Sequence, residues 1–275
     1  MSLRISVSLL AAMACLASPS VSHAQSPGMA KLAEQAGHKI SGEEWKAVVV
    51  WDFSDQAGKY SKLGVALADE FSATLSNSHP KFDVIERSRI AELAAEEKLD
   101  PKAASNPIII GWMAKKLGAN GIIFGGTEAS SDGVYLELSL SKVSDAKPTK
   151  KSFRDDITLT DEQKALLDKP RGDPWKPARI TAARNYVKPP QCTYCPPAPF
   201  SDEARRLKLG GVVIVLADVS EEGEVTNVQL VQGLPFGLNE TAMETIRTWK
   251  FKPAVGRDDN PVAASVPIEV SFHLY

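Results

Sequence analysis

A CxxC motif, Cys192-Thr193-Tyr194-Cys195, is the strongest candidate for chemistry in this chain. A zinc site would need a second pair of ligands, and the only other cysteine, Cys15, lies in a segment that we expect to be removed. A c-type haem would need histidine directly after the motif, where the chain has Pro196. A thioredoxin-like redox centre places its CxxC at a helix start, whereas this motif lies in a proline-rich loop. The residues therefore favour a structural disulfide, with redox exchange and free thiols as the alternatives.

Other residues typical of catalysis or metal binding are scattered. None of the four histidines has a neighbour at ligand spacing, so we expect no metal site. Neither glycine-rich phosphate loop, GxxxxGK[ST] or GxGxxG, is present. We therefore expect no cofactor.

Two carboxylates, Asp52 and Asp55, follow an apolar run, where α/β enzymes often carry catalytic acids. A solvated strand end explains them equally well, and local pairing at a helix start explains Glu86-Arg87. Because no catalytic group has a recognisable partner, we expect no enzymatic activity. An enzyme or redox protein that uses Asp52 or the CxxC motif is the third of three functional hypotheses.

The N-terminus has the three parts of a secretory signal at residues 1–24. Arg4 supplies the basic start, Ile5 to Ala17 the apolar core, and Ser22-His23-Ala24 the small-residue cleavage site. This apolar core is shorter than the ~20 residues of a membrane span, and no later stretch is apolar enough. We expect a mature periplasmic protein without an integral span, either free or associated with the outer membrane; acylation at Cys15 is the alternative. The oxidising periplasm favours the disulfide.

Length and composition predict two globular domains. Of the 275 residues 43% are hydrophobic, as in folded proteins, and the mature length suits two domains of ordinary size. A formal net charge of −2 and the lack of a dense basic patch argue against a nucleic-acid partner. The proline-rich segment 169–190 is expected to be a fairly stiff linker. We expect the domains to move independently, with docking through apolar patches as the alternative.

Strands alternate with helices in the first predicted domain, residues 45–168, which follows an N-terminal segment at 25–44. The clearest helix, at 61–77, has Leu63, Leu67, Phe71 and Leu75 at every fourth position. The other expected elements are strands at 47–53, 82–85 and 122–126, helices at 90–98 and 109–117, a hairpin around 134–140 and a strand at 153–159. This order predicts an α/β sandwich of two or three layers.

The second predicted domain, residues 191–275, is a small α+β unit with the order strand, strand, helix, strand. An apolar strand at 212–219 leads through a turn at 220–223 into a return strand, which makes a hairpin. The last strand alternates strictly from Val266 to Leu274, so we expect one buried and one polar face.

The helix of this domain is predicted from one apolar stripe. Its members are Leu238, Ala242, Ile246 and Trp249. We expect Asn239 to cap its start and Pro253 to end it.

Residues 190–275 resemble the C-terminal domain of TonB-type energy transducers. The matching features are Pro199-Phe200, Ala204-Arg205, Gly211, Glu222-Gly223 and the run from Trp249 to Ala254. Those proteins work in the periplasm of Gram-negative bacteria and grip outer-membrane transporters through an exposed sheet edge. The resemblance implies an outer-membrane transporter or envelope protein segment as the partner, bound by strand addition at 263–272.

The resemblance also implies the partner-binding residues. They are Pro199 and Phe200 ahead of the first strand, and Ala263, Ser265, Pro267, Glu269, Ser271 and His273 on the last one. The family's uncleaved anchor and long proline-rich spacer are not evident, so energy transduction is not implied. A homodimer is left open. TonB-like partner binding, related to TonB-dependent transport, is the first functional hypothesis.

Residues 45–158 resemble the group of periplasmic domains that includes the curli-assembly CsgG, FlgO and the TolB N-terminal domain. The matching runs are VVVWDF, FDVIERSRI and KKLGANGIIFGG. In that group the domain packs against partners or lies under the outer membrane. This resemblance implies the second functional hypothesis, a cell-envelope scaffold or assembly protein that acts through its N-terminal domain.

Overall fold

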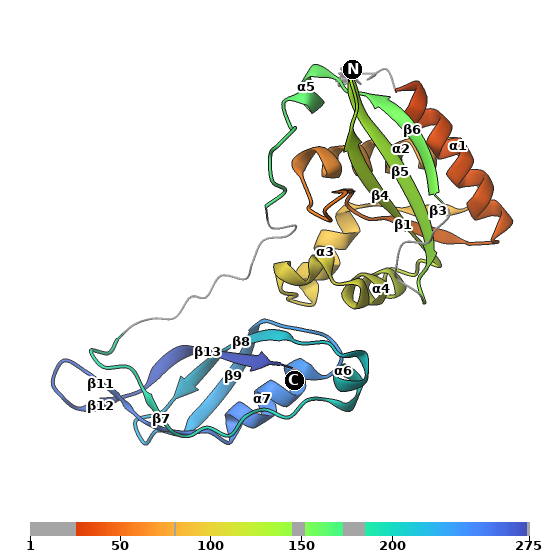
Figure 1. Ribbon diagram of the computed structural model, residues 1–275. Helices are drawn as coiled ribbons and strands as arrows, with labels where there is room; N and C mark the ends of the chain where they lie inside the picture. Colours follow the sequence, from red (N-terminus) through yellow and green to blue (C-terminus); the bar gives the residue numbers. More distant parts are fainter. Residues whose placement is uncertain (1–25, 80, 145–151, 173–184, 274–275) are drawn as a thin grey trace, which may run out of the picture.

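The computed structural model describes residues 26–79, 81–144, 152–172 and 185–273 and contains two domains, each built on its own sheet (Figure 1). The predicted signal at 1–24 lies outside the described residues. The N-terminal domain contains α1 (Pro27–Gly42), β1 (Ala47–Val50), β2 (Ser54–Asp55), α2 (Lys62–Ser78), β3 (Asp83–Ile85), α3 (Ser88–Glu96), the 3-10 helix η1 (Pro101–Ser105), α4 (Pro107–Lys116), β4 (Gly121–Ala129), β5 (Gly133–Lys142), β6 (Ser152–Thr158) and α5 (Asp161–Lys164).

The N-terminal sheet has the strand order β3-β1-β4-β5-β6, with β2 beside β4. Strands β3, β1 and β4 are parallel, whereas β4, β5 and β6 are antiparallel. Helices α1 and α2 pack on the face that buries Val48 and Val50, and α3 and α4 pack on the face that buries Val49 and Ile122. The parallel strands therefore have helices on both faces, as their continuous apolar sequences require.

Helix α1 lies within 25–44, the segment that the sequence analysis placed before the domain. Its side chains Met29, Leu32 and Ile40 are fully buried, and the helix packs against α2 and β6. The folded domain therefore begins near Pro27 rather than at residue 45. Alanine and glycine make up much of the buried stripe, and they carry little hydrophobic signal.

The C-terminal domain contains a three-stranded antiparallel sheet of order β13-β8-β9 and two smaller sheets, β7–β10 and β11–β12. Gly223 forms the predicted hairpin turn, with a φ of 83° that glycine adopts without strain. The elements are β7 (Gln191–Tyr194), α6 (Asp202–Leu207), β8 (Gly211–Val219), β9 (Val225–Gln232), α7 (Leu238–Arg247), β10 (Lys250–Lys252), β11 (Ala254–Val255), β12 (Pro261–Val262) and β13 (Ala264–Phe272).

Helix α7 differs from the sequence prediction at both ends. Its N-cap is Gly237, and the Oδ1 of Asn239 instead accepts a hydrogen bond from the N–H of Leu234 at 2.8 Å. The helix ends at Arg247, and the chain then enters β10, which pairs with β7. Trp249 therefore lies beyond the helix. The helix therefore ends before Pro253, where the chain leaves it to pair with β7.

The two domains are joined by backbone hydrogen bonds, at what we call the seam: Lys98–Asp100 against Leu230–Gly233. The N–H of Gly233 donates to Lys98 O at 2.7 Å, and the N–H of Asp100 donates to Gly233 O at 3.2 Å. Leu99 and Gly233 thereby form a parallel bridge. The Nζ of Lys98 also donates to Leu230 O at 2.8 Å. The expectation of separate domains is therefore corrected in favour of the docked alternative.

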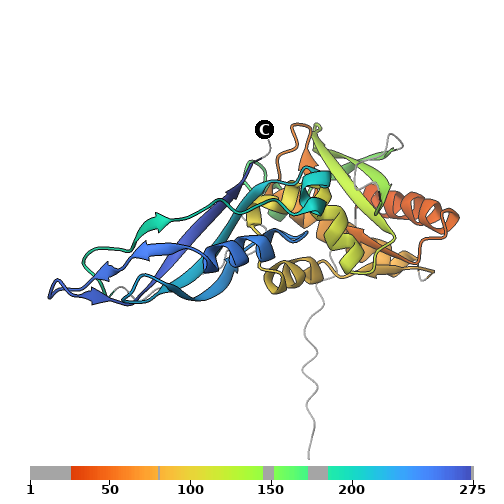
Figure 2. The same cartoon turned by 90° about the horizontal axis from the view of Figure 1, so that it is seen from below.

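Apolar packing continues across the seam. Buried residues of α3, α4, β8 and α7 belong to one core cluster, and the ring centroids of Trp112 and Phe236 lie 6.1 Å apart. Figures 1 and 2 show the C-terminal domain next to α3 and α4. Contacts of this kind connect apolar patches far apart in the sequence, which no local pattern predicts.

The start of the predicted linker is hydrogen-bonded to the N-terminal domain, and its end is hydrogen-bonded to the C-terminal domain. Lys169 O accepts from the N–H of Lys62 at 2.9 Å, and the N–H of Val187 donates to Val255 O at 2.8 Å. Residues 173–184 lie outside the described residues. Within the described part of the chain, none of the helices combines the length and apolar character that crossing a bilayer requires.

Candidate partner-binding edge

Strand β13 lies at the edge of its sheet: among the described residues it pairs only with β8. The pairing runs without a register shift from Ala264 opposite Val219 to Phe272 opposite Gly211. The other long side of β13 has no strand partner in the described ranges. An edge of this kind offers unpaired backbone N–H and C=O groups to an incoming chain.

Four of the predicted binding residues share one face of β13. Ser265, Pro267, Glu269 and Ser271 are opposite Asp218, Leu216, Ile214 and Val212 of β8, respectively. We call this the open face, because the neighbouring β8 positions, Val213, Val215 and Ala217, are buried in the same cluster as α7 on the other face. Ser265 is half-buried and hydrogen-bonded to Asp218, whereas Pro267, Glu269 and Ser271 are exposed.

The remaining predicted residues lie in different surroundings. Ala263 and His273 flank β13 and are exposed, and Ala263 O accepts a hydrogen bond from Asn185 Nδ2 at 3.0 Å. Pro199 is also exposed. Phe200 packs instead against Phe272, with ring centroids 5.3 Å apart. Phe272 lies on the face of the sheet that packs against α7. Phe200 therefore contacts the end of β13 on that face and is not part of the open face.

Sequence reasoning missed a cleft beside this face. Glu269, Val212 and Ile214 of the sheet meet Asp100 and Asn106 of the N-terminal domain around a cleft of about 740 Å³. This cleft exists only because the domains dock at the seam. The one signal for it in the sequence is that both faces of 212–219 carry apolar side chains.

The predicted disulfide between Cys192 and Cys195 is present. Cys192 lies in β7, Cys195 directly follows that strand, and α6 begins only at Asp202. The pair is therefore not at a helix start, the position that lowers a thiol pKa in thioredoxin-like centres. The geometry agrees with a structural bond.

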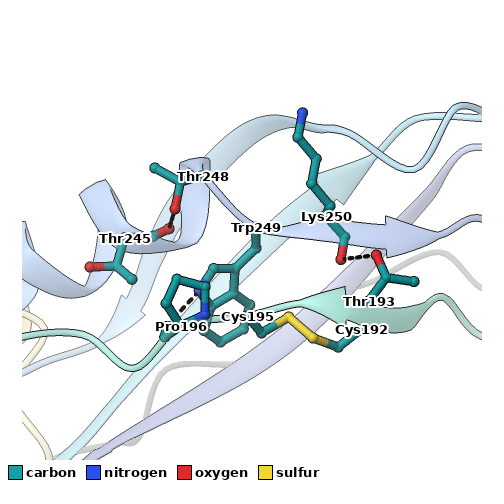
Figure 3. Close-up of a disulfide and its surroundings, with 8 residues drawn as sticks. All are labelled: Cys192, Thr193, Cys195, Pro196, Thr245, Thr248, Trp249 and Lys250. Atoms are coloured by element: carbon teal, nitrogen blue, oxygen red, sulfur yellow. Dashed lines mark hydrogen bonds between the residues drawn. A yellow bond between two sulfur atoms is a disulfide. The ribbon is translucent and has the colours of Figure 1, made fainter.

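Hydrogen bonds hold the disulfide segment beside β10 (Figure 3). Thr193 Oγ1 donates to Lys250 O at 2.9 Å, and Trp249 Nε1 donates to Pro196 O at 2.9 Å. The indole thus satisfies its N–H while its ring packs against the core. Together these contacts fix the chain that leads into the C-terminal sheet.

The two acidic candidates of the N-terminal domain have separate roles. Asp55 Oδ1 accepts from the N–H of Lys59 at 2.7 Å and closes a turn. Asp52 accepts from two arginines, Arg87 and Arg171, so Arg87 does not pair locally as the sequence analysis expects. Among the described residues, no cluster of three or more His, Cys, Asp or Glu side chains could hold a metal ion.

Comparison with known families identifies the C-terminal region. Residues 196–274 match the family model of the Gram-negative bacterial TonB protein C-terminal. This match covers less than a third of the chain and includes α6, α7 and β8 to β13 in chain order. A TonB C-terminal domain is therefore present at these residues. No curated protein matches the chain.

Three solved structures show limited likeness. The LpoB C-terminal domain from Salmonella enterica has a TM-score of 0.38 at 12% identity and covers 48% of this chain and 96% of its own. The TonB C-terminal domain from Pseudomonas aeruginosa has a TM-score of 0.28 at 17% identity, with coverages of 34% and 96%. Lipoprotein GNA1162 from Neisseria meningitidis has a TM-score of 0.31 at 14% identity, with coverages of 42% and 82%. The resemblance of residues 45–158 to the CsgG, FlgO and TolB group stays a prediction.

Proposed function

We propose that this protein binds an extended segment of a cell-envelope partner, which adds as a strand to the unpaired side of β13. The observation that carries the proposal is the edge position of β13 along its whole length. In strand addition the main chain supplies the hydrogen bonds, and alternate side chains of the guest contact the host surface. Exposed Pro267, Glu269 and Ser271 on the open face of β13 are the host side chains next to such a guest.

Pro267 indicates which residues of β13 present their backbone to the guest. In an antiparallel pair, residues alternate between those bonded to the partner strand and those whose N–H and C=O point away from it. Proline has no N–H and occurs in edge strands with that position turned outward. In a regular ladder, Ser265, Glu269 and Ser271 have the same orientation as Pro267, so their backbone groups face the unpaired side.

The opposite edge of the sheet is less accessible. Near its end, β9 is engaged by the seam, where Lys98 and Asp100 take up backbone groups of Leu230 and Gly233. The N-terminal domain thus occupies part of one edge and leaves the other unpaired. This asymmetry supports β13 as the guest site.

The family match of residues 196–274 supports the proposed compartment and partner class. We propose a periplasmic location and a partner that is an outer-membrane transporter or another envelope protein, with a non-enzymatic role. Force transmission is not part of the proposal. The N-terminal domain contributes the seam and one wall of the cleft beside Glu269.

Site-specific photocrosslinking in cells tests the proposal. A photoreactive residue in place of Ser271 on β13 is compared with the same residue in place of Thr226, an exposed position on β9. We expect a discrete adduct with an envelope protein from position 271 and none from 226. Equal adducts at both positions, or none at 271 in several envelope preparations, would contradict strand addition at β13.

A further inference from the structure

A second cavity lies at the carboxyl ends of the parallel strands in the N-terminal domain. After β1 the chain turns to α2 on one face of the sheet, and after β3 it turns to α3 on the other. The loops therefore diverge and leave a crevice, which is where ligands bind in open α/β sheets. Here the crevice is a cavity of about 450 Å³. It is separate from the β13 edge.

Arg87 forms one charged wall of this cavity, and each of its three guanidinium nitrogens donates a hydrogen bond. Its Nη2 donates to Asp52 Oδ1 at 2.5 Å, its Nη1 to Val50 O at 2.6 Å and its Nε to Asp69 Oδ1 at 2.5 Å. The side chain is only 11% exposed. These bonds hold Asp52 and the end of β1 in place, so the wall is built before any ligand arrives.

Arg171 forms the other charged wall and is not fully engaged. Its Nη1 donates to Asp52 Oδ2 at 2.6 Å, and its guanidinium carbon lies 4.3 Å from the centroid of the Tyr60 ring. Its Nε is buried and has no hydrogen-bond partner among the described residues. A buried donor without an acceptor is unfavourable. The protein therefore leaves part of the donor capacity of Arg171 unused.

The placement of Arg171 is fixed by the backbone as well. Its N–H donates to Tyr60 O at 3.2 Å, next to the bond from Lys62 to Lys169. Burial raises the pKa of the half-buried Tyr60 hydroxyl, against the lowering effect of Arg171 and together with the raising effect of Asp52. The first residues of the linker thus complete the cavity.

Charge and shape in the cavity favour an anion with an apolar body. Three cationic residues, Lys62, Arg87 and Arg171, face two carboxylates, Asp52 and Asp69. The N-terminal turns of α2 and α3 also line the cavity and add positive potential. The apolar lining comes from Trp51, Val65, Ile90, Ala91 and Ala104.

We propose that this cavity binds a small organic anion whose carboxylate or phosphate oxygens accept hydrogen bonds from Arg171. The apolar part of the ligand packs against Trp51 and Ile90. Such a bond to a charged donor contributes about 1.5–3 kcal/mol, so its loss weakens binding roughly tenfold or more.

Calorimetric titration of the full mature chain tests the proposal with benzoate and phenyl phosphate at constant ionic strength, against chloride. We expect saturable binding of at least one probe, and the preferred probe distinguishes a carboxylate from a phosphate site. Arg171→Ala should weaken binding tenfold or more. Arg257→Ala, at an exposed loop arginine, should leave it unchanged.

A second variant, which is expected to tighten binding, distinguishes a lost ligand contact from misfolding in Arg171→Ala. Asp69→Asn keeps an acceptor oxygen for Arg87 Nε but removes a carboxylate charge that lines the cavity and competes with the ligand. It should tighten binding severalfold, with folding checked by circular dichroism. No saturable binding of either probe to the wild type, or unchanged or weaker binding in Asp69→Asn, would overturn the proposal.

Discussion

The orientation inferred for β13 predicts opposite tolerance to proline at two adjacent positions. Ser271 has the same orientation as Pro267, so its N–H faces the unpaired side of the strand. Val270 has the other orientation, and its N–H then bonds to β8 at Val213, its partner in the register. Proline should therefore be accepted at 271 and rejected at 270.

The expected magnitudes follow from these surroundings. Ser271 is exposed, and proline also restricts the unfolded chain, a gain of about 0.4–1 kcal/mol where the backbone fits. We expect Ser271→Pro to change the free energy of unfolding by less than ~1 kcal/mol. Val270 is 7% exposed, and proline there leaves the Val213 carbonyl without its donor. Val270→Pro should therefore lower the free energy of unfolding by at least ~2 kcal/mol more than Ser271→Pro does.

Urea unfolding followed by circular dichroism measures both changes. Val270→Ala is the control, because it keeps the N–H and so separates lost packing from the lost hydrogen bond. The partner readout is the photocrosslink moved to Ser265, where Ser271→Pro should reduce the adduct about fivefold, equivalent to about 1 kcal/mol. If the two proline variants are equally destabilised, the inferred orientation of β13 is wrong.

Three further predictions concern the remaining contacts. Trp112→Ala removes a ring that packs across the domains, and calorimetry should then show two thermal transitions where the wild type shows one; two transitions in the wild type would contradict docking. Serine in place of Cys192 and Cys195 should cost no more than about 2 kcal/mol, because the closed loop is very short; a loss of folding would refute this. Lys31 pairs with Asp155 at 2.7 Å and its hydrogen bond is the main cause that lowers the pKa of Asp155. The stability from this pair is therefore present above the unfolded pKa of about 3.9 and is lost as the pH falls through the lower folded value. Lys31→Ala should remove that component from an acid titration of stability, and an unchanged titration would contradict the assignment.

Elements with strong local signals could be predicted from the sequence. The stripe from Leu63 to Leu75 defines α2 within one residue at each end, and the turn before Gly223 defines the β8–β9 hairpin. The strict alternation from Val266 onward predicts both the strand and its polar face. In each case the pattern that predicts the element lies in residues near one another in sequence.

The prediction failed where distant residues decide the structure. Trp249 continues the helical stripe, yet the pairing of β10 with β7 places it outside the helix. Arg87 follows a short strand and has an acidic neighbour, yet it reaches Asp52 in the loop after β1. The cleft beside Glu269 needs two domains to meet. None of these contacts leaves a periodic trace in the sequence.

Pro267 also bears on whether the protein associates with itself. If two copies met through β13 in an antiparallel arrangement, each would bring one position that cannot donate a hydrogen bond to the new ladder. Exposed edges otherwise serve as templates for continued sheet growth and aggregation, and proline on an edge strand is one way in which proteins suppress it. The residue that marks the free edge thus also makes copies of this chain poor guests for one another. A different guest can place opposite Pro267 a residue that needs no hydrogen bond from an N–H at this position. Its binding is then weakened less by the proline.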